Sequence, residues 1–225
     1  MKSALVCATI LAALLPSLSA QEPSTSVTVA GLASPLTIRN TADGIRSVGG
    51  ELQIRSAGHT NLFNPPSGST PVDSAPMALF TPDADFVLVA KATAELKAVY
   101  DVAALVLYED GQTWAKLCYE MSPEKRATVV SVVNRGVSDD TNSFAVEEGF
   151  VHLAIARKGS EFSFHASKDG KTWTLIRHFQ LVTKGNLRAG FAVHGSVGDG
   201  IAGSFTEIRY VSRAPAKMRA FAFPQ

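Results

Sequence analysis

Short apolar runs that alternate with period two are the feature that most constrains the fold of this chain. They end at turn residues roughly every 8–15 positions, a spacing typical of all-β proteins. Pairs such as Asp110-Gly111 and Asp169-Gly170 supply the positive φ angles that tight hairpin turns require. No window shows the capped 3.6-residue periodicity of a major helix. The predicted strands are 36–39, 51–55, 86–94, 102–108, 114–121, 127–134, 150–157, 161–166, 172–179, 187–194 and 202–211.

These runs predict an all-β fold, a two-sheet antiparallel sandwich of jelly-roll type. One domain is expected from residue 27 to 213, with a long loop over 56–82 and a short unstructured tail over 214–225. The 225 residues are 46% hydrophobic, enough for a core without cross-links. The net charge is +1 and no basic stripe stands out, which argues against a nucleic-acid partner.

The first 20 residues have the pattern of a secretory signal peptide. Lys2 precedes an apolar run from Ala4 to Leu15, and small residues lead to a polar boundary after Ala20. The run is shorter than the ~20 residues that span a bilayer, so an uncleaved anchor is disfavoured. Cleavage would remove Cys7 and leave Cys118 alone, without an internal disulfide. We therefore expect a secreted or periplasmic monomer that has no membrane partner after cleavage.

Three segments are distinctive: WAKLCYE at 114–120, SVVNRGVSD at 131–139 and SKDGKTW at 167–173. Together they resemble a poorly characterised family that includes the "regulation of enolase" proteins, within the concanavalin A-like lectin/glucanase superfamily. The resemblance covers roughly residues 36–208, and it implies a jelly-roll sandwich with a concave face and a tendency to bind carbohydrate. It implies no known reaction. The chain departs from the family at Phe63, where a Trp is common, and at 194–200, where His194 replaces an amide.

The strand over 114–121 carries the main candidate site. Period two places Trp114, Lys116 and Glu120 on one face, and Leu117 and Tyr119 on the other, core-like face. An aromatic ring, a cation and a carboxylate in one row are what a sugar site uses, because rings stack on pyranose C–H groups and charged groups bind hydroxyls. A solvated face with a Lys–Glu pair beside a packed Trp fits the same pattern, and both interpretations stay open.

Four further residues are candidates for the rim of this site. Asn134 and Asp139 stand at the end of the next strand and in its loop, whereas turn chemistry is the preferred explanation for Asp140. Arg157 ends another predicted strand and is a candidate ion-pair partner of Glu120. His194 is a candidate for ligand contact, with an ordinary rim histidine as the alternative.

The sequence favours a binding protein over an enzyme. Glycoside hydrolysis needs two carboxylates, and Glu120 has no acidic residue at i−2 or i+2. No histidine pair has the spacing of a zinc site, and no cofactor is expected. A structural calcium ion is a lesser option, with Asp83, Asp85 and Asp199 as oxygen donors. The leading hypothesis is an exported, non-catalytic carbohydrate-binding domain; the alternatives are a polysaccharide-acting enzyme using Glu120 and a structural or protein-interaction domain.

Overall fold

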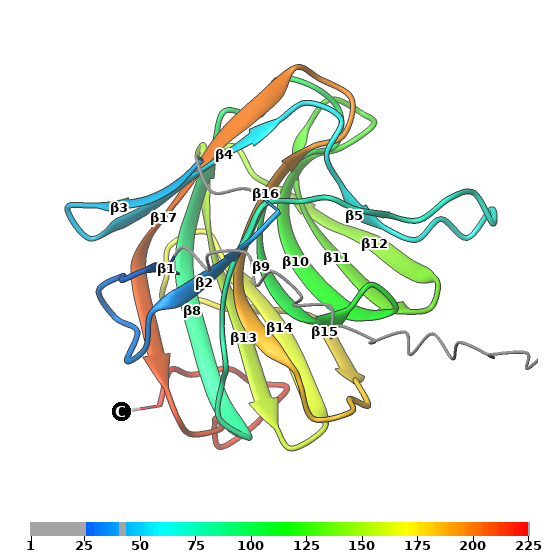
Figure 1. Ribbon diagram of the computed structural model, residues 1–225. Helices are drawn as coiled ribbons and strands as arrows, with labels where there is room; N and C mark the ends of the chain where they lie inside the picture. Colours follow the sequence, from blue (N-terminus) through cyan, green and yellow to red (C-terminus); the bar gives the residue numbers. More distant parts are fainter. Residues whose placement is uncertain (1–25, 41–43, 225) are drawn as a thin grey trace, which may run out of the picture.

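Two large antiparallel sheets pack face to face in the computed structural model, which describes residues 26–40 and 44–224 (Figure 1). Sheet A has the strand order β1-β2-β7-β16-β9-β10-β11-β12, and sheet B has the order β15-β14-β13-β8-β17-β4-β3. A separate two-stranded ribbon joins β5 and β6. The described residues contain no helix. The predicted all-β, two-sheet jelly-roll sandwich is confirmed.

The strands have the following bounds: β1 Ser26–Val27, β2 Leu36–Arg39, β3 Ile45–Val48, β4 Glu51–Ala57, β5 Leu62–Phe63, β6 Val72–Asp73, β7 Met77–Phe80, β8 Asp85–Ala94, β9 Asp101–Asp110, β10 Thr113–Met121, β11 Ala127–Arg135, β12 Ser138–Ala145, β13 Phe150–Lys158, β14 Glu161–Ser167, β15 Thr174–Gln180, β16 Arg188–Gly195 and β17 Gly200–Val211.

Each of the eleven predicted runs corresponds to a strand, but β1, β3, β5, β6, β7 and β12 were not predicted. Two of these, β5 and β12, contribute residues to the site described below. Strand β5 has only two residues and lies inside the expected 56–82 loop, where prolines obscure it. The edge strand β12 begins with Ser, Asp and Thr residues and is mostly exposed, so it lacks the apolar alternation that marks a strand.

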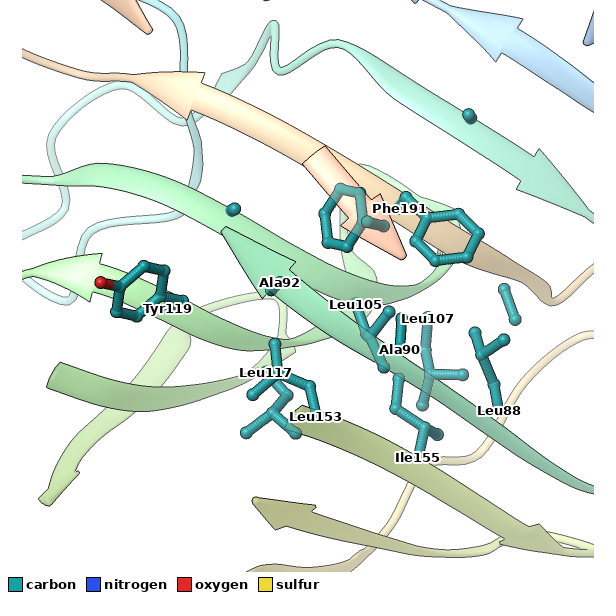
Figure 2. Close-up of a cluster of buried hydrophobic side chains, with 14 of the residues drawn as sticks. Leu88, Ala90, Ala92, Leu105, Leu107, Leu117, Tyr119, Leu153, Ile155 and Phe191 are labelled. Carbon is teal, nitrogen blue, oxygen red and sulfur yellow. The ribbon is translucent and has the colours of Figure 1, made fainter. Parts of the chain in front are cut away.

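The main core lies between the two sheets. Figure 2 shows Leu105 and Leu117 of sheet A beside Leu153 and Leu88 of sheet B, in one apolar layer. Leu117 and Tyr119 are both buried in this cluster, which confirms the predicted inward face of the 114–121 strand. The alternate residues of β10 therefore lie on the outer face of sheet A, away from sheet B.

A covering segment, residues 58–76, crosses this outer face between β4 and β7 (Figure 1). Its Leu62 and Ala75 pack in a second apolar cluster with Tyr108 and Trp114. Side-chain hydrogen bonds hold the segment in place: Asp73 accepts from the Tyr108 hydroxyl at 2.7 Å and from the Arg39 guanidinium at 2.8 Å. The outer face of sheet A is thus partly covered instead of fully open.

The C-terminal residues pack on the outer face of sheet B. The expected tail has no helix or strand over 214–224, yet Met218 is buried and Phe221 and Phe223 pack beside it. The buried His165 ring donates a hydrogen bond from Nε2 to the Met218 carbonyl at 3.0 Å. The expectation of an unstructured tail therefore does not hold for the part of the tail that the structure describes. Its apolar side chains cover Val87 and its neighbours on the sheet.

The predicted signal peptide, residues 1–20, lies outside the described residues. Within the described part of the chain, no helix has the length and apolar character needed to cross a membrane.

Candidate functional site

A cavity of about 260 Å³ opens on the outer face of sheet A beside the covering segment. Its deep residues are buried and come from the sheet: Val102, Lys116, Glu120, Val130, Val132 and His194. Its rim is more exposed and comes mainly from loops and the edge strand: Asn61, Phe63, Tyr100, Asp140 and Ser196. The cavity thus combines an apolar floor with polar groups at its base and two aromatic rings at its rim.

The register of sheet A brings the polar base together. Glu120 of β10 lies opposite Val102 of β9, and Val102 lies opposite His194 of β16. Glu120 and His194 therefore stand in one row across three strands. Lys116 lies four residues before Glu120 on the same face of β10, so its long side chain can run along the strand toward that row.

Lys116 and His194 form a buried polar contact, with Nζ of the lysine 3.1 Å from Nε2 of the histidine. An ammonium group has no lone pair, so it donates, and His194 Nε2 accepts. His194 Nδ1 then carries the proton and points to Ser196 Oγ at 3.5 Å. Burial, reinforced by the Lys116 charge, holds the pKa of His194 well below its ordinary value. His194 is therefore a neutral acceptor for the lysine at neutral pH.

Glu120 is a carboxyl group whose pKa is raised to about 7. Burial is the main cause, since its residue is only 8% exposed. The Lys116 charge opposes this shift and the Asp140 carboxylate adds to it. Among the described residues no group donates a hydrogen bond to Glu120, although the residue lines the cavity. Its carboxyl group is therefore available to a ligand.

Trp114 does not line the cavity, and its expected role as an accessible stacking platform is wrong. Its side chain is completely buried, because Leu62 and Ala75 of the covering segment close over it. Its ring lies 5.8 Å from Lys116 Nζ, within the range of a cation–π contact. Trp114 thus contacts Lys116 from within the packed interior. The sequence pattern of the long loop did not indicate that this loop would cover Trp114.

Asn134 is also placed away from the cavity. It is fully buried, donates from Nδ2 to the Gln112 carbonyl at 2.8 Å, and accepts from the Ser138 hydroxyl at 3.2 Å. These bonds tie the turn between β9 and β10 to the start of β12. The side chain is structural, so its predicted position on the rim of the site is wrong.

The two aspartates of β12 have the opposite roles to those expected. The strand begins at Ser138, so alternation points Asp139 and Asp140 to different faces. Asp140 lies opposite Val132 and lines the cavity, whereas Asp139 lies opposite Val133 of the inter-sheet core and pairs with Arg177 of β15 at 3.4 Å. The structure thus brings Asp140 to the site and leaves Asp139 out.

Arg157 lies in sheet B, not beside Glu120. Its Nε donates to the Gly159 carbonyl at 2.7 Å, and Nη1 donates to the Asp83 carbonyl at 3.2 Å. Its guanidinium also lies 5.5 Å from the Phe162 ring centre. The suggested Arg157–Glu120 pair is therefore wrong, because β13 and β10 belong to different sheets.

Of the predicted set, the structure brings Lys116, Glu120 and His194 together. Sequence reasoning missed Asn61, Tyr100, Asp140 and Ser196 as rim residues. Phe63 was noted only as a departure from the family pattern. Loop residues carry no period that would reveal which face they approach, so only the fold of the covering segment placed Asn61 and Phe63 here.

The described residues contain no group of three or more His, Cys, Asp or Glu side chains placed to hold a metal ion. Two of the suggested calcium donors have protein partners: Asp83 Oδ2 accepts from the Tyr210 hydroxyl at 2.7 Å, and Asp85 Oδ1 accepts from the Gly159 amide at 2.9 Å. Cys118 is a buried free thiol, and burial raises its pKa well above the ordinary value. It therefore has the character of a packed apolar side chain.

A wider hollow of about 470 Å³ lies on sheet B, around Arg46, Arg55 and Glu95. These side chains are exposed; Arg46 bonds to the half-buried Gln53, and Glu95 pairs with the exposed Lys97. Among the described residues that line it, none is a buried polar group, unlike the cavity on sheet A. We therefore take the sheet A cavity as the candidate site.

Comparisons with solved structures support the fold. A functionally unknown protein from Saccharomyces cerevisiae aligns with a TM-score of 0.74 and 20% identity, over 81% of this chain and 97% of its own. A GH43 protein from Bacillus licheniformis, BlXynB, aligns with a TM-score of 0.58 and 19% identity, over 72% of this chain and 33% of its own. A xylan beta-1,4-xylosidase from Bacillus halodurans C-125 aligns with a TM-score of 0.59 and 16% identity, over 72% of this chain and 32% of its own. The chain thus spans about a third of these two proteins.

No curated protein matches the sequence. A family model described as "Protein of unknown function (DUF1349)" matches residues 39–213, which is nearly the whole sandwich. Together with the fold comparisons, this match confirms the resemblance found in the sequence. The chain belongs to the DUF1349 family.

Proposed function

We propose that this protein is an exported, non-catalytic domain that binds carbohydrate in the cavity of sheet A. The observation that carries the proposal is a buried ammonium and a buried carboxyl group that line one cavity with unused hydrogen-bonding capacity. Lys116 gives one N–H to His194, and its other two have no acceptor among the described residues. Glu120 likewise has no donor among them.

Adjacent hydroxyl groups are the ligand chemistry that matches this pair. A hydroxyl both donates and accepts, so one hydroxyl can accept from Lys116 while its neighbour donates to Glu120. A ligand carboxylate would suit Lys116 but would meet Glu120 and Asp140 with like charge. A ligand ammonium would be repelled by Lys116. An uncharged sugar avoids both conflicts.

The rim supplies the second part of a sugar site. Phe63 and Tyr100 are partly exposed aromatic residues at the mouth of the cavity. Aromatic faces contact the C–H surface of a pyranose, while the polar base binds its hydroxyls. These two rings take over the role that the sequence assigned to Trp114.

The test is binding of the purified mature chain to a panel of neutral and acidic glycans, followed by isothermal titration with the ligands found. The panel includes xylan, because two proteins of similar fold are a GH43 protein and a xylan beta-1,4-xylosidase. Lys116→Met should weaken binding at least tenfold, since it removes two donors from the cavity while keeping side-chain volume. Lys184→Met, at an exposed position, is the matched control. The proposal fails if the parent binds no glycan, or if the two variants bind equally.

A polysaccharide-acting enzyme is the second candidate, and one observation favours it. Glu120, whose pKa is raised to about 7, shares the cavity with Asp140, so two carboxyl groups face the same space. Glycosidases use such a pair as acid and base or nucleophile. Release of reducing ends from polysaccharides by the parent, absent in Glu120→Gln and in Asp140→Asn, would establish catalysis and overturn the non-catalytic proposal.

A further inference from the structure

The cavity is closed at the Trp114 end of β10. There the covering segment is anchored to the sheet by several hydrogen bonds. Asn64 Nδ2 donates to the Gly111 carbonyl at 2.9 Å and to the Gly136 carbonyl at 3.2 Å, and its backbone N–H donates to Ser138 Oγ at 2.9 Å. With Leu62 packed over Trp114, a sugar chain cannot continue along the sheet in this direction.

The cavity is also closed at the Glu120 end. Tyr100 immediately precedes β9 and has a positive φ of 65°. Its N–H donates to the Met121 carbonyl at 2.8 Å. The Ser196 N–H donates to the Tyr100 carbonyl at 3.4 Å, which links this wall to the end of β16. The Thr60 N–H donates to the Gly195 carbonyl at 3.1 Å and joins the same wall to the covering segment. Backbone hydrogen bonds thus join two loops and the covering segment along this side of the cavity.

The size of the cavity agrees with this closure. Its volume of about 260 Å³ lies below the ~300–1,000 Å³ range of ordinary small-molecule sites. An internal stretch of polysaccharide needs a groove that is open at both ends, because the chain must enter and leave. A closed cavity that contains buried polar groups has room for one sugar unit, with the rest of the chain leaving through the mouth at Phe63, Tyr100 and Asp140.

We propose that the cavity binds the terminal unit of a neutral glycan and does not bind internal units. The proposal rests on the proposed function and specifies its ligand: an uncharged chain end, inserted so that adjacent hydroxyls meet Lys116 and Glu120. The units that follow lie outside the cavity and contact at most the rim. The affinity for one glycan chain therefore depends on its terminal unit and not on the number of units in the glycan.

The test is isothermal titration of the mature chain with homologous linear series of one to six units. The probes are the β-1,4-xylose, β-1,4-glucose, α-1,4-glucose and β-1,4-mannose series, each at concentrations up to 10 mM. In a series that binds, the dissociation constant per mole of chain should change by less than threefold between two and six units. A change of threefold or more over that range overturns chain-end binding and leaves carbohydrate binding standing. If no member of any series binds, the proposed function fails as well.

The same series with Glu120→Ala locates the binding. Circular dichroism first confirms that the variant is folded. Loss of at least tenfold in affinity for every length is expected if the end enters the cavity. Parent-like affinity in the folded variant would mean that the sugar binds elsewhere and would overturn the proposal.

Discussion

Replacing Glu120 by glutamine should stabilise this protein at alkaline pH. Glu120 is buried, and its pKa in the folded protein is raised to about 7 from an ordinary value of 4.5. A raised carboxyl pKa means that the folded state holds a proton which the unfolded state has already released. Between pH 4.5 and 7 the free energy of unfolding therefore falls as pH rises. Above pH 7 it stays lower by the full amount that ionisation of Glu120 costs the folded state.

The magnitude follows from the size of the pKa change. Each pKa unit corresponds to ~1.4 kcal/mol, so the ionised Glu120 costs the folded state about 3 kcal/mol at pH 8. Glutamine has nearly the same shape and never ionises. Glu120→Gln should therefore equal the parent near pH 4.5 and exceed it by up to about 3 kcal/mol at pH 8. For a chain of this size that corresponds to roughly 6–12 °C in Tm.

Thermal and urea unfolding at half-unit steps from pH 4.5 to 8.5 would measure this difference. Glu147→Gln, which removes an exposed carboxylate, is the matched control for the change in net charge. A difference between Glu120→Gln and the parent that grows with pH, and is absent in the control, supports the reasoning. If Glu120→Gln is less stable than the parent at pH 8, then Lys116 stabilises an ionised Glu120 and the burial argument is refuted.

Five further substitutions test the fold and the site. Leu117→Asp should prevent folding, because it places a carboxylate between the two sheets; a cooperative unfolding transition and native circular dichroism would contradict the assigned inward face. Trp114→Ala should cost about 3–5 kcal/mol in urea unfolding, whereas Phe63→Ala, on the rim, should change stability by much less and weaken glycan binding instead. Met218→Ala should lower the free energy of unfolding by about 2 kcal/mol if the C-terminal residues cover sheet B, and no change would show that they do not. Burial lowers the pKa of His165 to about 4, so stability should fall as pH drops from 6.5 toward 4; His165→Gln should flatten that slope in urea unfolding, and an unchanged slope would exclude His165 as its source.

The strand framework was predictable because its signal is local. A half-buried strand alternates apolar and polar residues, and the eleven runs with that pattern all became strands. The inward face of β10 followed in the same way, since Leu117 and Tyr119 form one apolar row. Strand β12 was missed because an edge strand of mostly polar residues has no apolar row to read.

Half of the site was predictable and half was not, for a related reason. Lys116 and Glu120 share a face of one strand, so period two placed them together. Trp114 shares that face too, but a segment far away in the sequence covers it. Asp139 and Asp140 exchanged roles because the first residue of β12 decides which of them points to the cavity.

By itself the sequence determined the class of fold, the inward and outward faces of its main strands, and the lysine–glutamate row on β10. Only the tertiary structure decided which outward residues remain accessible, because a long loop covers one end of the sheet and leaves a closed cavity at the other. Alternation along a strand reports the direction of each side chain. What that side chain meets depends on where the rest of the chain packs.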